Sequence, residues 1–214
     1  MAPKPSTDRT ALIVVDMQNG FCRDEGSTAK LGAILDFDIA QCKAAIAPCV
    51  KLIEAARAAG VPVIFTRLQW RPDYRDGGVL TDELLPGLVE GRCCAAGSWD
   101  AELIDEMAPE ENDFIVDKNR YSAFYGTPLS SILSSLDIRS LVVCGVTTNI
   151  CVETTVRDAS QRDFRTFVVR DACGEIAPER HEWALTTIDT RFGWVINSAE
   201  VLSGWGQAGA ADAA

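Results

Sequence analysis

Short apolar runs alternate with helical patterns along this chain, and this alternation restricts the fold more than any other feature. The runs lie at residues 11–15, 61–66, 114–116, 141–146 and 166–169, with a weaker one at 194–196. Because each run is apolar throughout, both faces of the sheet are expected to be buried. Such strands joined by helices predict a Rossmann-like α/β fold of three layers, with a mainly parallel, roughly six-stranded sheet between two layers of helices.

Helical patterns fill most gaps between the runs. In residues 39–59 apolar side chains recur on one face, and Gly60 follows as a C-cap glycine. Shorter helices are expected at 128–136 and 179–191. The irregular stretch 68–113 predicts an extended loop with short helical pieces, and long loops of this kind are usually functional.

Length and composition indicate one domain. With 214 residues, of which 47% are hydrophobic and 24% charged, the chain is long enough for one large core. We expect an N-terminal extension at 1–10, a single domain at 11–205 and a disordered alanine-rich tail at 206–214.

The charge and the cysteines exclude several classes of protein. A formal net charge of −11, without clusters of Lys and Arg, argues against binding nucleic acid or an anionic membrane. The first ten residues lack the apolar region of a secretion signal, and no apolar stretch is long enough to span a membrane, so a cytoplasmic protein is expected. The eight cysteines include no C-x-x-C pair and His181 is the only histidine, so no metal and no cofactor are expected.

One cysteine stands where a reactive thiol is expected. The apolar run 141–146 leads through a polar turn to Cys151, in the first turn of a predicted helix. There the unpaired backbone N–H groups and the helix dipole favour an anion, which predicts a thiol pKa lowered from about 8.5 toward neutrality. The placement suggests that Cys151 is a covalent nucleophile.

Two charged residues at other strand ends complete a candidate site. Asp16 directly follows the first run and Lys118 follows the third, and the carboxyl ends of parallel strands meet at one edge of a sheet. A histidine usually takes the thiol proton, but His181 lies in a polar helical segment, so Asp16 is the better base and acid. Lys118 would hold the thiolate by its charge, and the backbone N–H groups of Thr147 and Cys151 would receive an oxyanion.

Each of these residues also has a plain structural interpretation. Asp16 alone is explained as a strand-end cap, Lys118 as a solvated loop lysine and Cys151 as a buried helix cysteine. Three chemically matched groups at three strand ends are harder to explain in that way, so their joint placement favours catalysis.

Three sequence motifs resemble those of a known enzyme family. Residues 11–19 (ALIVVDMQN), 117–124 (DKNRYSAF) and 145–152 (GVTTNICV) resemble those of the isochorismatase-like cysteine hydrolases. That family includes nicotinamidases, N-carbamoylsarcosine amidohydrolases, biuret hydrolases and ureidoacrylate amidohydrolases. The resemblance implies a triad of Asp16, Lys118 and Cys151, a cis peptide between Val146 and Thr147, and a homodimer or homotetramer.

Within that family the chain looks most similar to the ureidoacrylate amidohydrolases. Nicotinamidases carry a metal site with histidine after the second strand, whereas residues 66–73 contain none. The resemblance implies that Trp70, Asp76 and Tyr121 line the substrate pocket. Leu68 departs from the pattern of the ureidoacrylate amidohydrolases, which have an asparagine at this position. Without that amide, the chain lacks one partner for a substrate carbonyl.

Position alone suggests four weaker substrate contacts. Gln18 and Phe21, just past Asp16, are expected as pocket walls. Arg67 and Arg71 are candidates for binding a substrate carboxylate.

These observations predict a metal-free cysteine amidohydrolase that cleaves a C–N bond of a small ureido or N-carbamoyl compound through an acyl-enzyme. The alternatives within the enzymes are an isochorismatase and a biuret- or N-carbamoylsarcosine-type amidohydrolase. The alternative outside them is a redox-sensing or binding protein that uses Cys151 as a sensor thiol.

Overall fold

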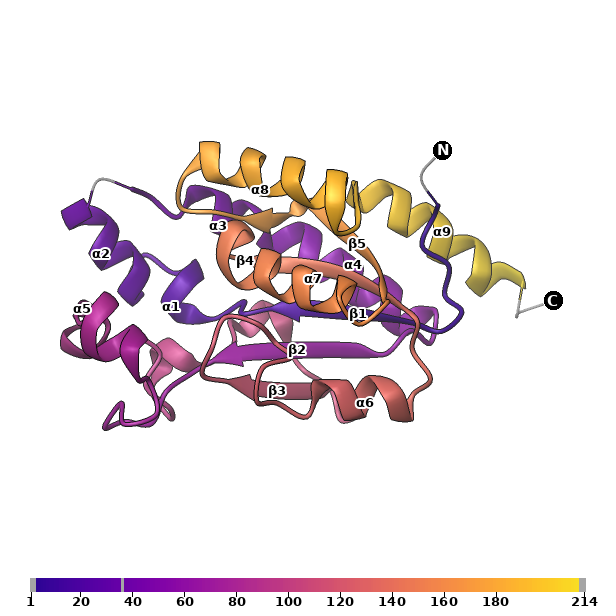
Figure 1. Cartoon of the computed structure of the whole chain (residues 1–214). Helices are drawn as coiled ribbons and strands as arrows, with labels where there is room; N and C mark the ends of the chain where they lie inside the picture. Colours follow the sequence, from indigo (N-terminus) through magenta and orange to yellow (C-terminus); the bar gives the residue numbers. More distant parts are fainter. Residues whose placement is uncertain (1–2, 36, 212–214) are drawn as a thin grey trace.

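A single parallel sheet organises the molecule. The computed structural model describes residues 3–35 and 37–211, and within them six parallel strands pair in the order β3-β2-β1-β4-β5-β6 (Figure 1). The strands are β1 (Thr10–Val15), β2 (Val63–Leu68), β3 (Phe114–Lys118), β4 (Ser140–Val146), β5 (Arg165–Gly174) and β6 (Trp194–Ile196). The predicted three-layer α/β fold is confirmed.

Helices cover both faces of the sheet. One face packs against α6 (Leu129–Ser135), α7 (Glu153–Ser160) and α8 (Pro178–Arg191). The other packs against α3 (Ala40–Ala44), α4 (Ile46–Ala58) and α9 (Ser198–Ala211). Shorter pieces are α1 (Asn19–Cys22), α2 (Ser27–Leu35), η1 (Leu80–Leu84), α5 (Gly87–Glu90), η2 (Trp99–Ala101), η3 (Asp105–Met107) and η4 (Thr148–Val152). Of these, α1, α2 and α5 lie at the end of the sheet where β1 ends (Figure 1).

The central strand β1 shows why the runs are apolar throughout. Ile13 and Val15 point into the core beneath α7 and α8, whereas Leu12 and Val14 point into the core beneath α4. All four side chains are fully buried. Because successive side chains alternate between faces that are both covered, no position on the strand favours a polar residue.

Gly145 lets β4 approach β1 closely near the carboxyl ends of the strands. Its φ is +113°, a conformation that residues with a Cβ rarely adopt, and a Cβ there would lie 2.1 Å from the carbonyl oxygen of Val15. The pairing of β4 with β5 shifts register between Val143 and Gly145. Glycine is therefore required where β4 leads into the turn before Cys151.

Two sequence predictions differ from the structure. The helix expected at 39–59 is split into α3 and α4, since Pro48 lacks an N–H and leaves the Ala44 carbonyl without its helical donor. The tail predicted to be disordered from Gly206 is helical to Ala211, in keeping with the helix propensity of alanine, and residues 212–214 lie outside the described part. Among the described residues, no helix has the length and apolarity needed to cross a membrane.

Candidate active site

The structure brings Asp16, Lys118 and Cys151 together at the carboxyl edge of the sheet. Asp16 directly follows β1, Lys118 is the last residue of β3, and Cys151 lies in η4, the turn that follows β4. Lys118 Nζ is 2.7 Å from Asp16 Oδ2, and both side chains are fully buried. Cys151 is 3% exposed, and its thiol lies close enough to both for their charges to act on its pKa.

Asp16 is held in a strained backbone conformation. Its φ of 49° lies in the left-handed region, which costs a non-glycine residue on the order of 1–3 kcal/mol. Neighbouring β2 supports this geometry, because Thr66 Oγ1 donates a 2.6 Å hydrogen bond to Asp16 Oδ1 and the Thr66 carbonyl accepts from the Asp16 N–H at 3.2 Å. One carboxylate oxygen is thereby bound to β2, and the other faces Lys118.

Lys118 remains a cation inside the protein. Burial lowers its pKa, but the negative charge of Asp16 and the neighbouring Cys151 outweigh burial, so that its pKa lies above the ordinary value. The ammonium also donates to the Arg120 carbonyl at 3.2 Å. A buried ammonium with a carboxylate partner and a carbonyl acceptor can keep its charge.

The thiol of Cys151 differs from its prediction. Burial raises its pKa above the ordinary value, and the charge of Lys118 opposes this rise while that of Asp16 adds to it. The low pKa expected from the helix N-terminus is therefore wrong, because desolvation outweighs the favourable charges. In the resting site the sulfur keeps its proton, and a base must accept that proton during attack.

The turn that carries Cys151 begins with a cis peptide. This bond lies between Val146 and Thr147, where the resemblance implied it. From Thr147 the chain enters η4, a π-helical turn, and continues into α7. The Thr147 carbonyl accepts from the N–H groups of Ile150 and Val152, both at 3.2 Å. The N–H groups of Thr147 and Cys151, the expected oxyanion donors, thus belong to one compact turn.

Gln18 links the end of β2 to η2 and is not free to bind a substrate. Its Nε2 donates to the carbonyls of Leu68 and Ala101 at 2.9 and 2.8 Å, and its Oε1 accepts from the Leu68 N–H at 2.7 Å. The side chain is fully buried and both amide hydrogens are used. The predicted substrate contact is therefore replaced by a structural role.

The aromatic pocket candidates lie in or against the core around Cys151. Trp70 is 2% exposed, and its Nε1 donates to the Asn119 carbonyl at 3.1 Å. Burial, and next the neighbouring Cys151, raise the pKa of Tyr121, so this phenol lies near the thiol. Phe21 is half-buried and packs against the cores on both sides of the sheet. All three thus lie in or against the apolar core that contains Cys151.

The charged pocket candidates have partners of their own. Asp76 accepts from the Arg71 N–H at 3.0 Å and from Asn119 Nδ2 at 3.3 Å, so it connects the loop after β2 to the loop after β3. Arg67 pairs with Asp117 through two hydrogen bonds of 2.7 and 3.0 Å. Arg71 pairs with Asp73 in the same way, at 3.0 and 3.1 Å. Neither arginine is a free cation for a substrate carboxylate.

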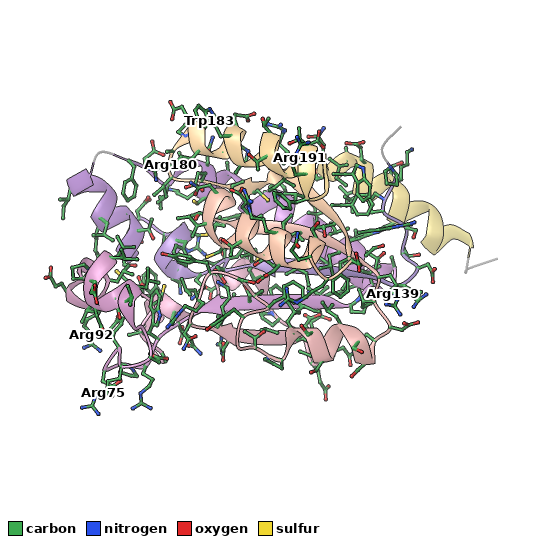
Figure 2. The ribbon with its side chains drawn as sticks, in the orientation of Figure 1. Arg75, Arg92, Arg139, Arg180, Trp183 and Arg191 are labelled. Carbon is green, nitrogen blue, oxygen red and sulfur yellow. The ribbon has the colours of Figure 1, made fainter. Side chains whose placement is uncertain are left out.

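The sequence interpretation missed the part played by His181. The imidazole is 7% exposed and its Nδ1 lies 2.9 Å from Thr148 Oγ1, in the turn that carries Cys151. Trp183, 78% exposed, lies on the outer side of the same helix (Figure 2). The spacing of His181 from Leu185 and Ile188 matches one helical face, and this signal identifies a buried histidine.

Within the described residues, no group of three or more His, Cys, Asp or Glu could hold a metal ion.

Because His181 is buried, we expect the free energy of unfolding to decrease in acid. Burial lowers its pKa from the ordinary 6.5, so the folded protein resists protonation that the unfolded chain accepts. The stabilising effect of neutral His181 is complete above pH 6.5 and declines as the pH falls from there through the folded-state pKa. We expect His181→Asn to lose less stability than the wild-type protein between pH 7.5 and 5.5 in urea unfolding. An equal loss in the two proteins would contradict the lowered pKa.

Comparisons with known proteins identify the family of this chain and agree with its fold. Residues 10–200 match the isochorismatase domain family. A ureidoacrylate amidohydrolase RutB from Azorhizobium caulinodans is 37% identical, with 96% of this chain and 95% of that protein aligned. Another from Pseudomonas syringae pv. syringae is 41% identical over 87% of this chain and 79% of its own length.

A solved structure supports the same assignment. The crystal structure of a cysteine hydrolase from Pseudomonas syringae pv. phaseolicola superposes with a TM-score of 0.86 at 34% identity, covering 96% of each chain. The sheet order, the family match along residues 10–200 and these relatives agree. The chain therefore belongs to the isochorismatase family of hydrolases, as its three motifs predicted.

Proposed function

We propose that this chain is a metal-free cysteine amidohydrolase that hydrolyses a C–N bond of a small ureido or N-carbamoyl compound. The observation that carries the proposal is the buried contact of Asp16, Lys118 and Cys151. It joins a nucleophile, a base and a cation in a site without water-exposed charge, where electrostatic effects on a reacting group are large. Ureidoacrylate is the first substrate to test, because the relatives named above carry that activity in their names.

In the first half of the reaction, Cys151 Sγ attacks the carbonyl carbon of the ureido group. The thiol proton passes to the Asp16 carboxylate, which lies near the sulfur and is held in place by Thr66 and Lys118. The N–H groups of Thr147 and Cys151 receive the oxyanion. Collapse breaks the C–N bond, and Asp16 returns its proton to the leaving nitrogen.

In the second half, water hydrolyses the carbamoyl group that remains on the sulfur. Asp16 accepts a proton from the water as the water oxygen bonds to the carbamoyl carbon, the C–S bond then breaks, and the proton passes to the departing Cys151 thiolate. Carbamate leaves as the second product. Lys118 keeps its charge throughout and balances the negative charge that moves between Asp16 and the sulfur.

The aromatic residues suggest how a flat substrate is held. Trp70, Tyr121 and Phe21 supply apolar walls, as expected for a small planar ureido compound. Leu68 is 3% exposed and belongs to the same apolar core as Cys151, so it offers no hydrogen bond to a substrate carbonyl. We expect the preferred ureido acid to be one that does not need this bond. The homodimer or homotetramer remains a prediction for sedimentation to test.

A release assay over a panel of substrates tests the proposal. The panel holds ureidoacrylate, N-carbamoyl amino acids, biuret, nicotinamide and isochorismate. We expect at least one ureido or N-carbamoyl acid to exceed nicotinamide and isochorismate in kcat/KM by about tenfold or more, equivalent to about 1.4 kcal/mol in transition-state binding. Intact mass spectrometry on rapidly quenched mixtures should show a carbamoyl adduct.

Other results would select the alternatives. Preferred turnover of isochorismate would indicate vinyl ether hydrolysis, and turnover restricted to biuret would indicate the biuret-type activity. No turnover of any compound, together with reversible oxidation of Cys151, would favour the sensor thiol.

A further inference from the structure

A second buried polar network lies behind the turn that carries Cys151. Thr148 Oγ1 is 2.9 Å from the Gly174 carbonyl oxygen and 2.9 Å from His181 Nδ1. The Asn149 N–H donates to Glu175 Oε2 at 2.9 Å. Thr148 is fully buried, Glu175 is 1% exposed and His181 is 7% exposed. Two adjacent residues of the turn are thus tied to the end of β5 and, through the histidine, to α8.

The direction of each hydrogen bond follows from the chemistry of the groups. The Thr148 hydroxyl has one hydrogen, and the Gly174 carbonyl can only accept, so the hydroxyl donates to Gly174. His181 Nδ1 must then carry a hydrogen and donate to Thr148 Oγ1. Burial lowers the pKa of His181, which favours the neutral ring, and the hydrogen bond to Thr148 then places its one hydrogen on Nδ1. His181 therefore donates to Thr148, and Thr148 donates to Gly174.

The Gly174 carbonyl, which accepts the last of these hydrogen bonds, lies in a closely packed part of β5. A Cβ on Gly174 would lie 2.6 Å from backbone atoms of Gln41 and Cys42, so β5 lies directly against α3 at this point. The neighbouring Glu175 accepts from the Asn149 N–H with Oε2 and from the Ile176 N–H with Oε1, both at 2.9 Å. The two groups that hold the turn, the Gly174 carbonyl and the Glu175 carboxylate, thus lie at the packed end of β5.

We propose that His181, acting through Thr148, and Glu175, acting through Asn149, are positioning residues that hold the N–H groups of Thr147 and Cys151 in place for the oxyanion. This inference rests on the proposed function. Preorganised donors stabilise an oxyanion only if they need not move during the reaction. Neither His181 nor Glu175 has to touch the substrate to act in this way.

Substitutions of Thr148 and His181 separate positioning from folding. Thr148→Val keeps the shape of the side chain but cannot donate to Gly174, whereas Thr148→Ser keeps the hydroxyl. His181→Leu removes the donor, whereas His181→Asn places an amide N–H near the position of Nδ1. Thr186→Val, on the exposed side of α8, is the matched control for a threonine that does not contact the turn.

Three readouts are compared on the same proteins. We expect Thr148→Val and His181→Leu to lower kcat about 10- to 100-fold, as small displacements of catalytic groups do, with KM changed less than about threefold. Alkylation of Cys151 by iodoacetamide, in which sulfur displaces iodide and no oxyanion forms, should stay within about twofold of the wild-type rate. Hydrogen–deuterium exchange of the peptide covering residues 145–152 should be faster in both variants. Thr148→Ser, His181→Asn and Thr186→Val should resemble the wild-type protein in all three readouts.

Each contrary result has a defined meaning. Unchanged exchange and unchanged kcat in Thr148→Val would overturn the proposal. Alkylation that falls in parallel with kcat would overturn it too, because the variant would then have disturbed the nucleophile and not the oxyanion donors. A wild-type protein that hydrolyses no compound of the panel would refute the proposed function, while exchange at residues 145–152 would still decide whether the anchors hold the turn. Combining Thr148→Val with His181→Leu should slow the reaction no more than the stronger single variant, since both break one chain of hydrogen bonds.

Discussion

Cys151→Ala is expected to lower the rate on every amide or ureido substrate by at least about 10⁴-fold, because the thiol that forms the acyl-enzyme is lost. The fold should survive, since the Asp16–Lys118 ion pair is unchanged and only one buried sulfur is lost, at a cost of about 1 kcal/mol. Release assays give the rate, and thermal unfolding gives the stability. The carbamoyl adduct seen by mass spectrometry in the wild-type protein should be absent.

Cys49→Ala is the matched control for this variant. Cys49 is also fully buried, but it lies under the other face of the sheet and its thiol donates to the Ala172 carbonyl at 3.3 Å. We expect it to keep the activity and the adduct with a similar loss of stability. Full turnover in Cys151→Ala would rule out the covalent mechanism.

Asp16→Asn is expected to have two large effects with separate causes. The rate should fall by about 10⁴-fold, because an amide cannot take the thiol proton that burial retains on Cys151. Stability should fall by about 3–5 kcal/mol, because Lys118, whose side chain is fully buried, loses its counter-charge. Steady-state kinetics and urea unfolding measure the two effects, and KM should change little because Asp16 acts on the proton.

The double variant Asp16→Asn/Lys118→Met separates the two effects. Removing both charges leaves no unpaired ion at this position, so much of the lost stability should return while the activity stays absent. A near-normal rate in Asp16→Asn would show that another group is the base. If the single variant were as stable as the wild-type protein, the ion pair would contribute little to folding.

The fold could be predicted because its signals are local. Val14 and its neighbours in β1 are apolar on both faces, and this pattern is visible without knowing what covers them. The breaks in the prediction are local too, since Pro48 splits the helix expected at 39–59. The convergence of Asp16, Lys118 and Cys151 followed from a rule about strand ends in parallel sheets.

Partners of side chains could not be predicted in the same way. Gln18 bonds to the backbone of Leu68 and Ala101, 50 and 83 residues away, and this occupies the amide that we expected to meet a substrate. Arg67 pairs with Asp117, also 50 residues distant, because β2 and β3 are neighbours. Such contacts depend on which strands pair and in what register.

By itself the sequence determined the family, the parallel sheet and the three residues at its carboxyl edge, because each depends on patterns along a short stretch of chain. Only the tertiary structure decided the environment of those residues. It buries the Cys151 thiol so that its pKa rises instead of falling, and it joins the only histidine to the turn through Thr148. The physical reason is that burial and charge act through space, between segments whose distance no local pattern encodes.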